Sequence, residues 1–198
     1  MQSFHNDIAV KCKYVARTEK HRKADELIRG TGWDGSKGCA VGCTLEKYDH
    51  SQYPIELGLP EWLARVEDTL FEGMSLERAM LWPSEFLLAI PVGVTENDFL
   101  YKVKAPFIRA MLEGTLKNFD NEKFPDVASA VQGSIALWSR DDLEAQSWES
   151  ARSAAWSAAA SAWSAAWSAR SARSAESAAR SAAYDGYADK LLELLRNL

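Results

Sequence analysis

The sequence is poor in the residues from which disulfide and metal frameworks are built. Its 198 residues include only three cysteines and three histidines. A small, odd number of cysteines argues against a disulfide framework and fits a reducing compartment. No run of 18 apolar residues occurs, and the first twenty residues show no signal-peptide pattern. We therefore expect a cytoplasmic protein that has no membrane partner.

A strong charge of either sign is also absent. The chain has 23 lysines and arginines against 28 aspartates and glutamates, a formal net charge of -5. This balance creates no field that would draw the chain to nucleic acid, and it is too weak to indicate a DNA mimic. Hydrophobic residues make up 47% of the chain, which is enough for a core. We expect one domain, residues 1–198, and no nucleic-acid partner.

Glycine, proline and β-branched residues are all missing from one long stretch, residues 147–184. The stretch holds 16 alanines, 11 serines, four tryptophans and four arginines. Because alanine is the best helix former and nothing here breaks a helix, the stretch is predicted to be helical. A helical projection gives a tryptophan stripe flanked by two arginines: Trp148, Trp156, Trp163, Trp167, Arg152 and Arg170. We expect this stripe to cover the protein's own core, with a partner or a second copy as the alternative.

The length of this stretch leaves its architecture open. One straight helix would run roughly 57 Å, which exceeds the roughly 42 Å diameter of a compact domain of this size. The stretch therefore either bends or projects and pairs with another copy. The serine positions change phase after Ser171, so a bend is predicted near residues 170–174.

The rest of the sequence also predicts helices and no strand pair. Helices are expected at 10–29, 61–73, 75–90 with an interruption at Pro83, 96–119 with a bend near Pro106, and 126–138. The fold class is therefore all-α, a helical bundle that has a long Ala/Ser/Trp-rich C-terminal helix or helical hairpin. We expect an N-terminal helical part (1–146) with a glycine-rich loop (30–43), the Ala/Ser/Trp-rich tract (147–184) and a last helix (185–198) set off by Asp185 and Gly186.

The glycine-rich loop contains residues that could bind an anion. Backbone N–H groups in such a loop can surround an anion, with Lys37 adding charge and Trp33 stacking on a ring. The pattern is not a Walker A motif, and no strand precedes it. The plain alternative is a structural loop held to the helices by Trp33.

The same loop offers two cysteines with a histidine downstream. Cys39, Cys43 and His50 have a spacing that zinc sites allow, although a fourth ligand is missing nearby. Together with Asp49, they are also the only set from which a nucleophile and a base could be assembled. The plain alternative is a tight loop with two small buried thiols. We therefore expect no cofactor and no catalytic residues, and keep a zinc protein or Cys/His enzyme as the second alternative.

Several blocks of the sequence resemble a family of uncharacterised bacteriophage and metagenomic proteins. The resemblance rests on the GCAVGC loop at residues 38–43, the ELGxPEWLARxED block at residues 56–68 and the Ala-rich C-terminal tract. It implies a setting, a phage protein acting in the host bacterial cytoplasm, and no catalytic residues.

From these observations we expect a non-enzymatic binding protein, with antagonism of a host defence as its setting. The first hypothesis is sequestration of a small anionic, nucleotide-like ligand by Trp33, Lys37, Arg152, Trp163 and Arg170. The alternative is a helical interaction protein that inhibits a host protein or forms a homo-oligomer.

Overall fold

A computed structural model describes residues 1–117, 120–140 and 173–198, with side chains in the last range described from Ala179 onward. Every regular element in these ranges is a helix, and β-type pairing is limited to isolated bridges such as that between Gln2 and Thr95. The fold class is all-α, as predicted. No described helix is long and apolar enough to cross a membrane. The described chain forms two compact units, Met1–Phe99 with Glu176–Leu198, and Leu100–Ala175.

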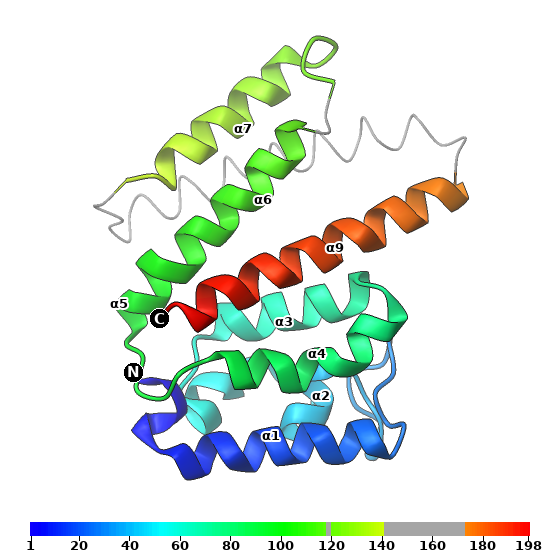
Figure 1. Cartoon of the computed structure of the whole chain (residues 1–198), viewed down its shortest axis with the longest axis vertical. Coiled ribbons are helices and arrows are strands. Elements are labelled where there is room, and N and C mark those ends of the chain that lie inside the picture. Colours follow the sequence, from blue (N-terminus) through cyan, green and yellow to red (C-terminus); the bar gives the residue numbers. More distant parts are fainter. Residues whose placement is uncertain (118–119, 141–172) are drawn as a thin grey trace. The chain divides into compact units, whose positions relative to one another are not determined.

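Helix α1 (Ile8–Lys23) packs along helix α4 (Leu76–Ala89) in the first unit (Figure 1). A short 3-10 turn, η1 (Ser3–Asn6), precedes α1. The Asp7 carboxylate caps the N-terminus of α1 by accepting a hydrogen bond from Ala9 N at 2.8 Å. Lys11 Nζ donates to the carbonyls of Leu88 and Ile90 at 2.8 and 2.6 Å. These last carbonyls of α4 have no partner within their own helix, so Lys11 holds the two helices together.

The expected helix over 10–29 is wrong in its last six residues, 24–29. Asp25 adopts a left-handed conformation with φ 54°, which ends the helical path after Lys23. The chain then pairs with the end of the glycine-rich loop, because Ile28 N donates to Gly38 O at 2.9 Å and Gly38 N to Glu26 O at 3.1 Å. This pairing buries Leu27 without a helix, so tertiary contacts overrule helix propensity there.

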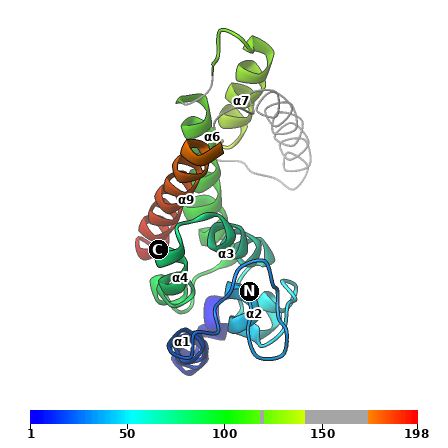
Figure 2. The ribbon, with the colours of Figure 1, turned by 90° about the vertical axis from the view of Figure 1, so that its right-hand side faces the viewer.

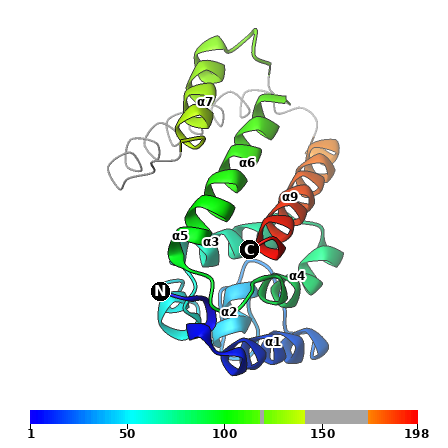
Figure 3. The ribbon, with the colours of Figure 1, turned by 60° about the vertical axis from the view of Figure 1, so that its left-hand side comes forward.

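The glycine-rich loop is less irregular than expected, because it leads into a short buried helix, α2 (Ala40–Leu45). All six residues of α2 are buried, and the helix contacts α1, α4 and α3 (Glu61–Gly73) (Figure 3). Figure 2 looks along α1 and shows α2 beside it. A Cβ atom placed on Gly42 or on Gly38 would collide with the Gly32 carbonyl. The close approach of loop to helix therefore explains two of the glycines in this segment.

Helix α3 is confirmed at both ends, with Pro60 before it and Gly73 as its last residue. Between α2 and α3 lies one π-helical turn, η2 (Tyr53–Leu57). The predicted interruption of the next helix at Pro83 is wrong, since α4 continues through it. Trp82, Phe86 and Leu87 in α4 are fully buried, and their burial outweighs the roughly 3 kcal/mol that an internal proline costs.

The last helix, α9 (Arg173–Arg196), is continuous through Asp185 and Gly186, so the predicted separation there is wrong. Asp185 Oδ1 accepts from Ser75 N at 3.0 Å, at the start of α4. Buried residues recur at helical spacing in the final turns: Ala188, Leu191, Leu192 and Leu195. This packing overcomes the preference of an Asp-Gly pair for a turn. The remainder of the Ala/Ser/Trp-rich tract, and most of the predicted bend at 170–174, lie outside the described residues.

The second unit is described over residues 100–117 and 120–140. Helix α6 (Ala105–Lys117) packs against α7 (Pro125–Leu137). In the sequence, α6 follows the short helix α5 (Glu96–Asp98) and a π-helical segment, η3 (Phe99–Lys104). This π-helical segment ends just before Pro106, whose nitrogen cannot donate a hydrogen bond. The bend expected near Pro106 stays a prediction.

Candidate functional site

The two strongest chemical candidates from the loop, Cys39 and His50, are both brought to one carboxylate, that of Asp68 on α3. His50 Nε2 lies 3.3 Å from Asp68 Oδ2, and Tyr48 OH donates to the same oxygen at 2.9 Å. Asp49, the acid expected beside His50, instead accepts from Ser51 N at 3.0 Å in a local turn. The sequence offered Asp49 as the acid beside His50, and the structure places Asp68 there instead.

The Cys39 thiol is held in a position that suits a structural role. Its Sγ caps α2 by accepting from Gly42 N at 3.5 Å, and the residue is 1% exposed. Burial, helped by the Asp68 carboxylate, raises the pKa of Cys39 well above its ordinary value. The thiolate that a nucleophile or a zinc ligand requires is therefore strongly disfavoured at neutral pH.

The Cys43 thiol lies against the backbone of the loop and of the segment before it. Its thiol donates to the carbonyls of Gly38 and Glu26 at 3.4 and 3.6 Å, and burial raises its pKa to about 12. Within the described ranges, no group of three or more His, Cys, Asp or Glu side chains is placed to hold a metal ion. The predicted zinc triad of Cys39, Cys43 and His50 is therefore not assembled there.

A second buried acid lies beside Asp68. Glu67 is fully buried, and Tyr53 OH donates to its Oε2. Burial raises the pKa of Glu67 to about 8, although the hydrogen bond from Tyr53 opposes the shift. Its Oε1 has no hydrogen-bond partner. This carboxyl group is part of the core and does not line either of the cavities described below.

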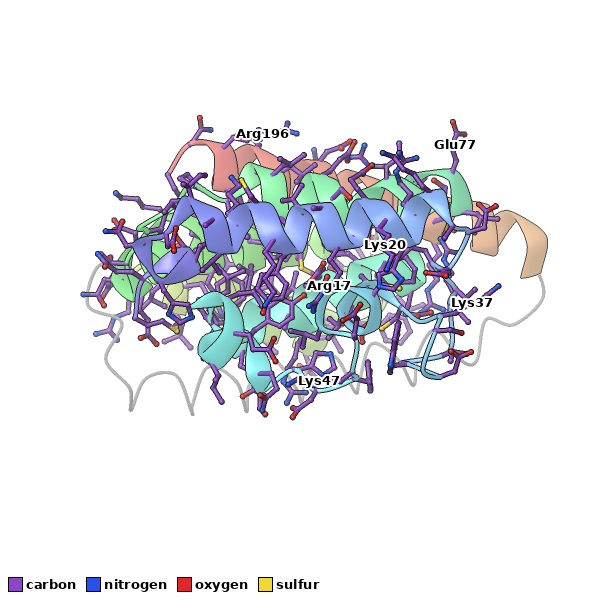
Figure 4. The ribbon with its side chains drawn as sticks, turned by 90° about the horizontal axis from the view of Figure 1, so that it is seen from below. Arg17, Lys20, Lys37, Lys47, Glu77 and Arg196 are labelled. Carbon is purple, nitrogen blue, oxygen red and sulfur yellow. The ribbon has the colours of Figure 1, made fainter. Side chains whose placement is uncertain are left out.

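The predicted anion-binding residues of the loop are not brought together. The Trp33 ring contacts His21 edge-on at 5.5 Å between centroids, which supports the plain alternative that Trp33 holds the loop to the helices. Lys37 is exposed, points away from the loop (Figure 4), and its backbone N donates to Asp34 Oδ1 at 2.7 Å. The other predicted ligand residues, Arg152, Trp163 and Arg170, lie outside the described residues.

A cavity of about 570 Å³ lies elsewhere, where α9 passes the second half of α3. We call it the Arg29–Arg180 cavity, because these two arginines are its basic residues. Among the described residues, the lining is Arg29, Asp68, Thr69, Glu72, Gly73, Arg180, Ser181 and Tyr184. Its volume is in the range typical of sites for small molecules.

Neither guanidinium in this cavity has an ion-pair partner among the described residues. Arg29 Nη2 donates to the Met74 carbonyl, and its Nε is buried with no hydrogen-bond partner. The Arg180 guanidinium lies over the Tyr184 ring, 5.8 Å from its centroid. The Tyr184 ring in turn packs directly on Gly73, where any Cβ atom would overlap it.

The carboxylates in the same cavity, by contrast, already accept hydrogen bonds. Both carboxylate oxygens of Glu72 accept from Gly30 N, at 3.1 and 3.0 Å. Asp68 accepts from Tyr48 and lies within hydrogen-bond distance of His50. Neither of these carboxylates is paired with Arg29 or Arg180, so both guanidinium groups can accept an anionic group as a partner.

A second cavity of about 480 Å³, between α4 and the last turns of α9, lacks this property. Its Arg78 already pairs with Glu85 at 3.1 Å and with Asp189 at 2.9 Å. Of its two arginines, Arg78 and Arg196, the first is therefore neutralised by carboxylates of the chain itself.

No local signal in the sequence marks Arg29 and Arg180 as residues of one site. Arg29 looked like the end of a basic helix, and Arg180 looked like one of several arginines in an alanine-rich tract. Only the docking of α9 on α3 brings them to one cavity. Comparisons of the chain with protein-family models, with curated proteins and with solved structures found no match.

Proposed function

We propose that this chain is a non-enzymatic binding protein for a small anionic ligand, held in the Arg29–Arg180 cavity. The observation that carries the proposal is the pair of guanidinium groups, Arg29 and Arg180, that line one cavity without a carboxylate partner in the described part of the chain. Arginine is always charged and binds carboxylate or phosphate with two parallel hydrogen bonds. An anion in this cavity would supply the acceptors that the protein does not.

The proposal keeps the predicted ligand class, a small anion, but places the ligand in the Arg29–Arg180 cavity and not at the glycine-rich loop. Trp33 and Lys37 do not line the cavity, so the proposed contacts are those of Arg29 and Arg180. The Tyr184 ring, the only aromatic ring in the lining, is already covered by Arg180. A stacked nucleotide base is thus less well supported than a compact carboxylate or phosphate.

The alternative of an interaction protein stays a prediction. It rests on Trp163 and on the alanine face of the tract, which lie outside the described residues. Antagonism of a host defence likewise stays a prediction, drawn from the resemblance to phage proteins. The enzyme alternative has less support, because the Cys39 and Cys43 thiols are buried and protonated.

The proposal is tested by measuring the melting temperature of the protein with a panel of anions at constant ionic strength. The panel contains phosphate, sulfate, small carboxylates and mononucleotides. We expect at least one anion to raise the melting temperature, because a ligand that binds only the folded state stabilises it. Arg180→Gln is expected to weaken that binding about 10- to 100-fold, since it removes charge-assisted hydrogen bonds.

Arg65→Gln is the matched control. Arg65 is an exposed arginine on α3 that already pairs with Glu61 and does not line the cavity. We expect this variant to bind the anion as the unchanged protein does. An equal loss in both variants, or no response to any anion, would show that the proposal is wrong.

A further inference from the structure

The two carboxylates of the Arg29–Arg180 cavity restrict what kind of anion fits. Arg29 and Arg180 contribute two positive charges, and Asp68 and Glu72 contribute two negative charges, so the lining is formally neutral. A ligand with negative charge alone would gain from the arginines and be repelled by the acids. A ligand that carries both signs can match both.

Glu72 is the acid that is free to take a second partner. It is exposed, and its two oxygens share a single donor, Gly30 N. A carboxylate offers about four acceptor positions, so most of its capacity is unused. Asp68 differs, because Tyr48 and His50 already converge on its Oδ2 and its Oδ1 is buried, so Glu72 is the more accessible of the two acids.

We propose that the ligand of this cavity is a small zwitterion, with a carboxylate or phosphate at Arg29 and Arg180 and an ammonium group at Glu72. This inference rests on the proposed function, because it presumes that the cavity binds an anionic group. The hydroxyl-bearing residues Thr69 and Ser181 add polar lining between the charged ones. The Tyr184 ring is covered by Arg180, so an aliphatic ammonium is favoured over a planar aromatic cation.

Matched pairs of probes that differ only in the ammonium group test this inference. O-phosphoethanolamine is compared with ethyl phosphate, and β-alanine with propionate, by isothermal titration calorimetry. We expect the zwitterion of at least one pair to bind about tenfold more tightly than its partner, as one added charged hydrogen bond would produce. Equal dissociation constants within both pairs, or no binding of any probe, would overturn the inference.

Variants separate this inference from the proposed function. Glu72→Gln keeps an acceptor for Gly30 N but removes the charge, so it should abolish the preference for the zwitterion while leaving the simple anion bound at least as well. Glu77→Gln, an exposed acid at the start of α4, should leave the preference unchanged. If Arg180→Gln weakens every probe while Glu72→Gln changes no preference, the cavity binds anions but the zwitterion assignment is wrong.

The same chemistry occurs in free metabolites and in lipid headgroups. Phosphatidylcholine vesicles with and without phosphatidylethanolamine distinguish these sources in a sedimentation assay. Binding to free O-phosphoethanolamine alone assigns a soluble zwitterion, and binding that depends on phosphatidylethanolamine assigns a headgroup. Either result supports the inference, and binding to neither contradicts it.

Discussion

At the scale of single residues, the acid Glu67 is unusual because it is fully buried in the core of the first unit. Its carboxyl group accepts from Tyr53, while its Oε1 has no partner in the core. Burial disfavours the charged form, so the side chain keeps its proton to about pH 8. Trp82 Nε1 donates to the backbone carbonyl of Glu67 at 3.0 Å, which fixes this part of α3 to α4.

The raised pKa of Glu67 predicts how stability changes with pH. Because the folded-state pKa of about 8 exceeds the ordinary value of 4.5, the folded protein holds a proton that the unfolded chain has released. The contribution of this group is fully present below about pH 4.5 and is lost as the pH rises toward 8. At about 1.4 kcal/mol for each pKa unit, the loss at pH 8 is on the order of a few kcal/mol.

Glu67→Gln should remove this dependence. We expect the variant to be as stable as the unchanged protein near pH 5 and more stable at pH 8, as measured by urea unfolding across that range. Glu61→Gln, an exposed acid on the same helix, should leave the pH profile unchanged. A Glu67→Gln variant whose stability falls between pH 5 and 8 as steeply as that of the unchanged protein would refute the assignment.

At the scale of elements, the close contact between α2 and the glycine-rich loop is set by backbone approach. Cys39 N donates to the carbonyls of Thr31 and Gly32 at 2.8 and 3.1 Å, and Gly42 faces the same Gly32 carbonyl. A side chain at position 42 leaves no room for this contact. The position of the loop against α2 thus requires glycine, which has no side chain, at position 42.

Gly42→Ala should therefore destabilise the first unit, by about 1–3 kcal/mol, as overpacking of a tight contact does. Gly186→Ala is the matched control, because Gly186 lies in the interior of α9 with open space around its Cα. It should stabilise the protein by about 0.5–1 kcal/mol, since alanine favours a helix interior. Denaturant unfolding measures both. A destabilising Gly186→Ala would show that α9 is not continuous there, and a neutral Gly42→Ala would show that the loop is not held tightly.

The helices that the sequence predicted correctly are those with local signals at both ends. Helix α3 has Pro60 before it, Gly73 at its end and apolar residues at helical spacing between them. The ends that were wrong, after Lys23 and at Asp185, depend on contacts with distant segments. The interruption predicted at Pro83 was wrong for a related reason. Whether the helix continues there depends on the burial of the neighbouring side chains, which local sequence does not show.

The candidate site was harder to predict than the fold. The sequence offered Cys39, Cys43, His50 and Asp49 only as a remote alternative, and it did not mark Asp68, which lies beside His50. Arg29 and Arg180 are far apart in the chain, and nothing local marks either as a binding residue. Arg29 and Arg180 come to one cavity because the final turns of α9 pack on the first unit. The apolar pattern of these turns predicts a helix, but it does not predict the surface against which that helix packs.

At the scale of the whole molecule, the chain has a net charge of -5. Even so, two arginines that have no carboxylate partner among the described residues line a single cavity. The overall charge gives no long-range attraction for anions, so selectivity must come from local geometry. Arg29 is half-buried and Arg180 is exposed, so we expect added salt to weaken the contribution of Arg180 more than that of Arg29.

The most direct test of the account is whether an anion contacts Arg180 itself. We would follow the Nε–Hε resonances of the arginines by two-dimensional ¹H–¹⁵N NMR during titration with the anion that raises the melting temperature most, assigning Arg180 by the Arg180→Gln variant. The account predicts a saturable shift of the Arg180 resonance, with that of Arg65 unmoved. Equal, non-saturating shifts of both, or no shift of Arg180 while binding occurs, would contradict it.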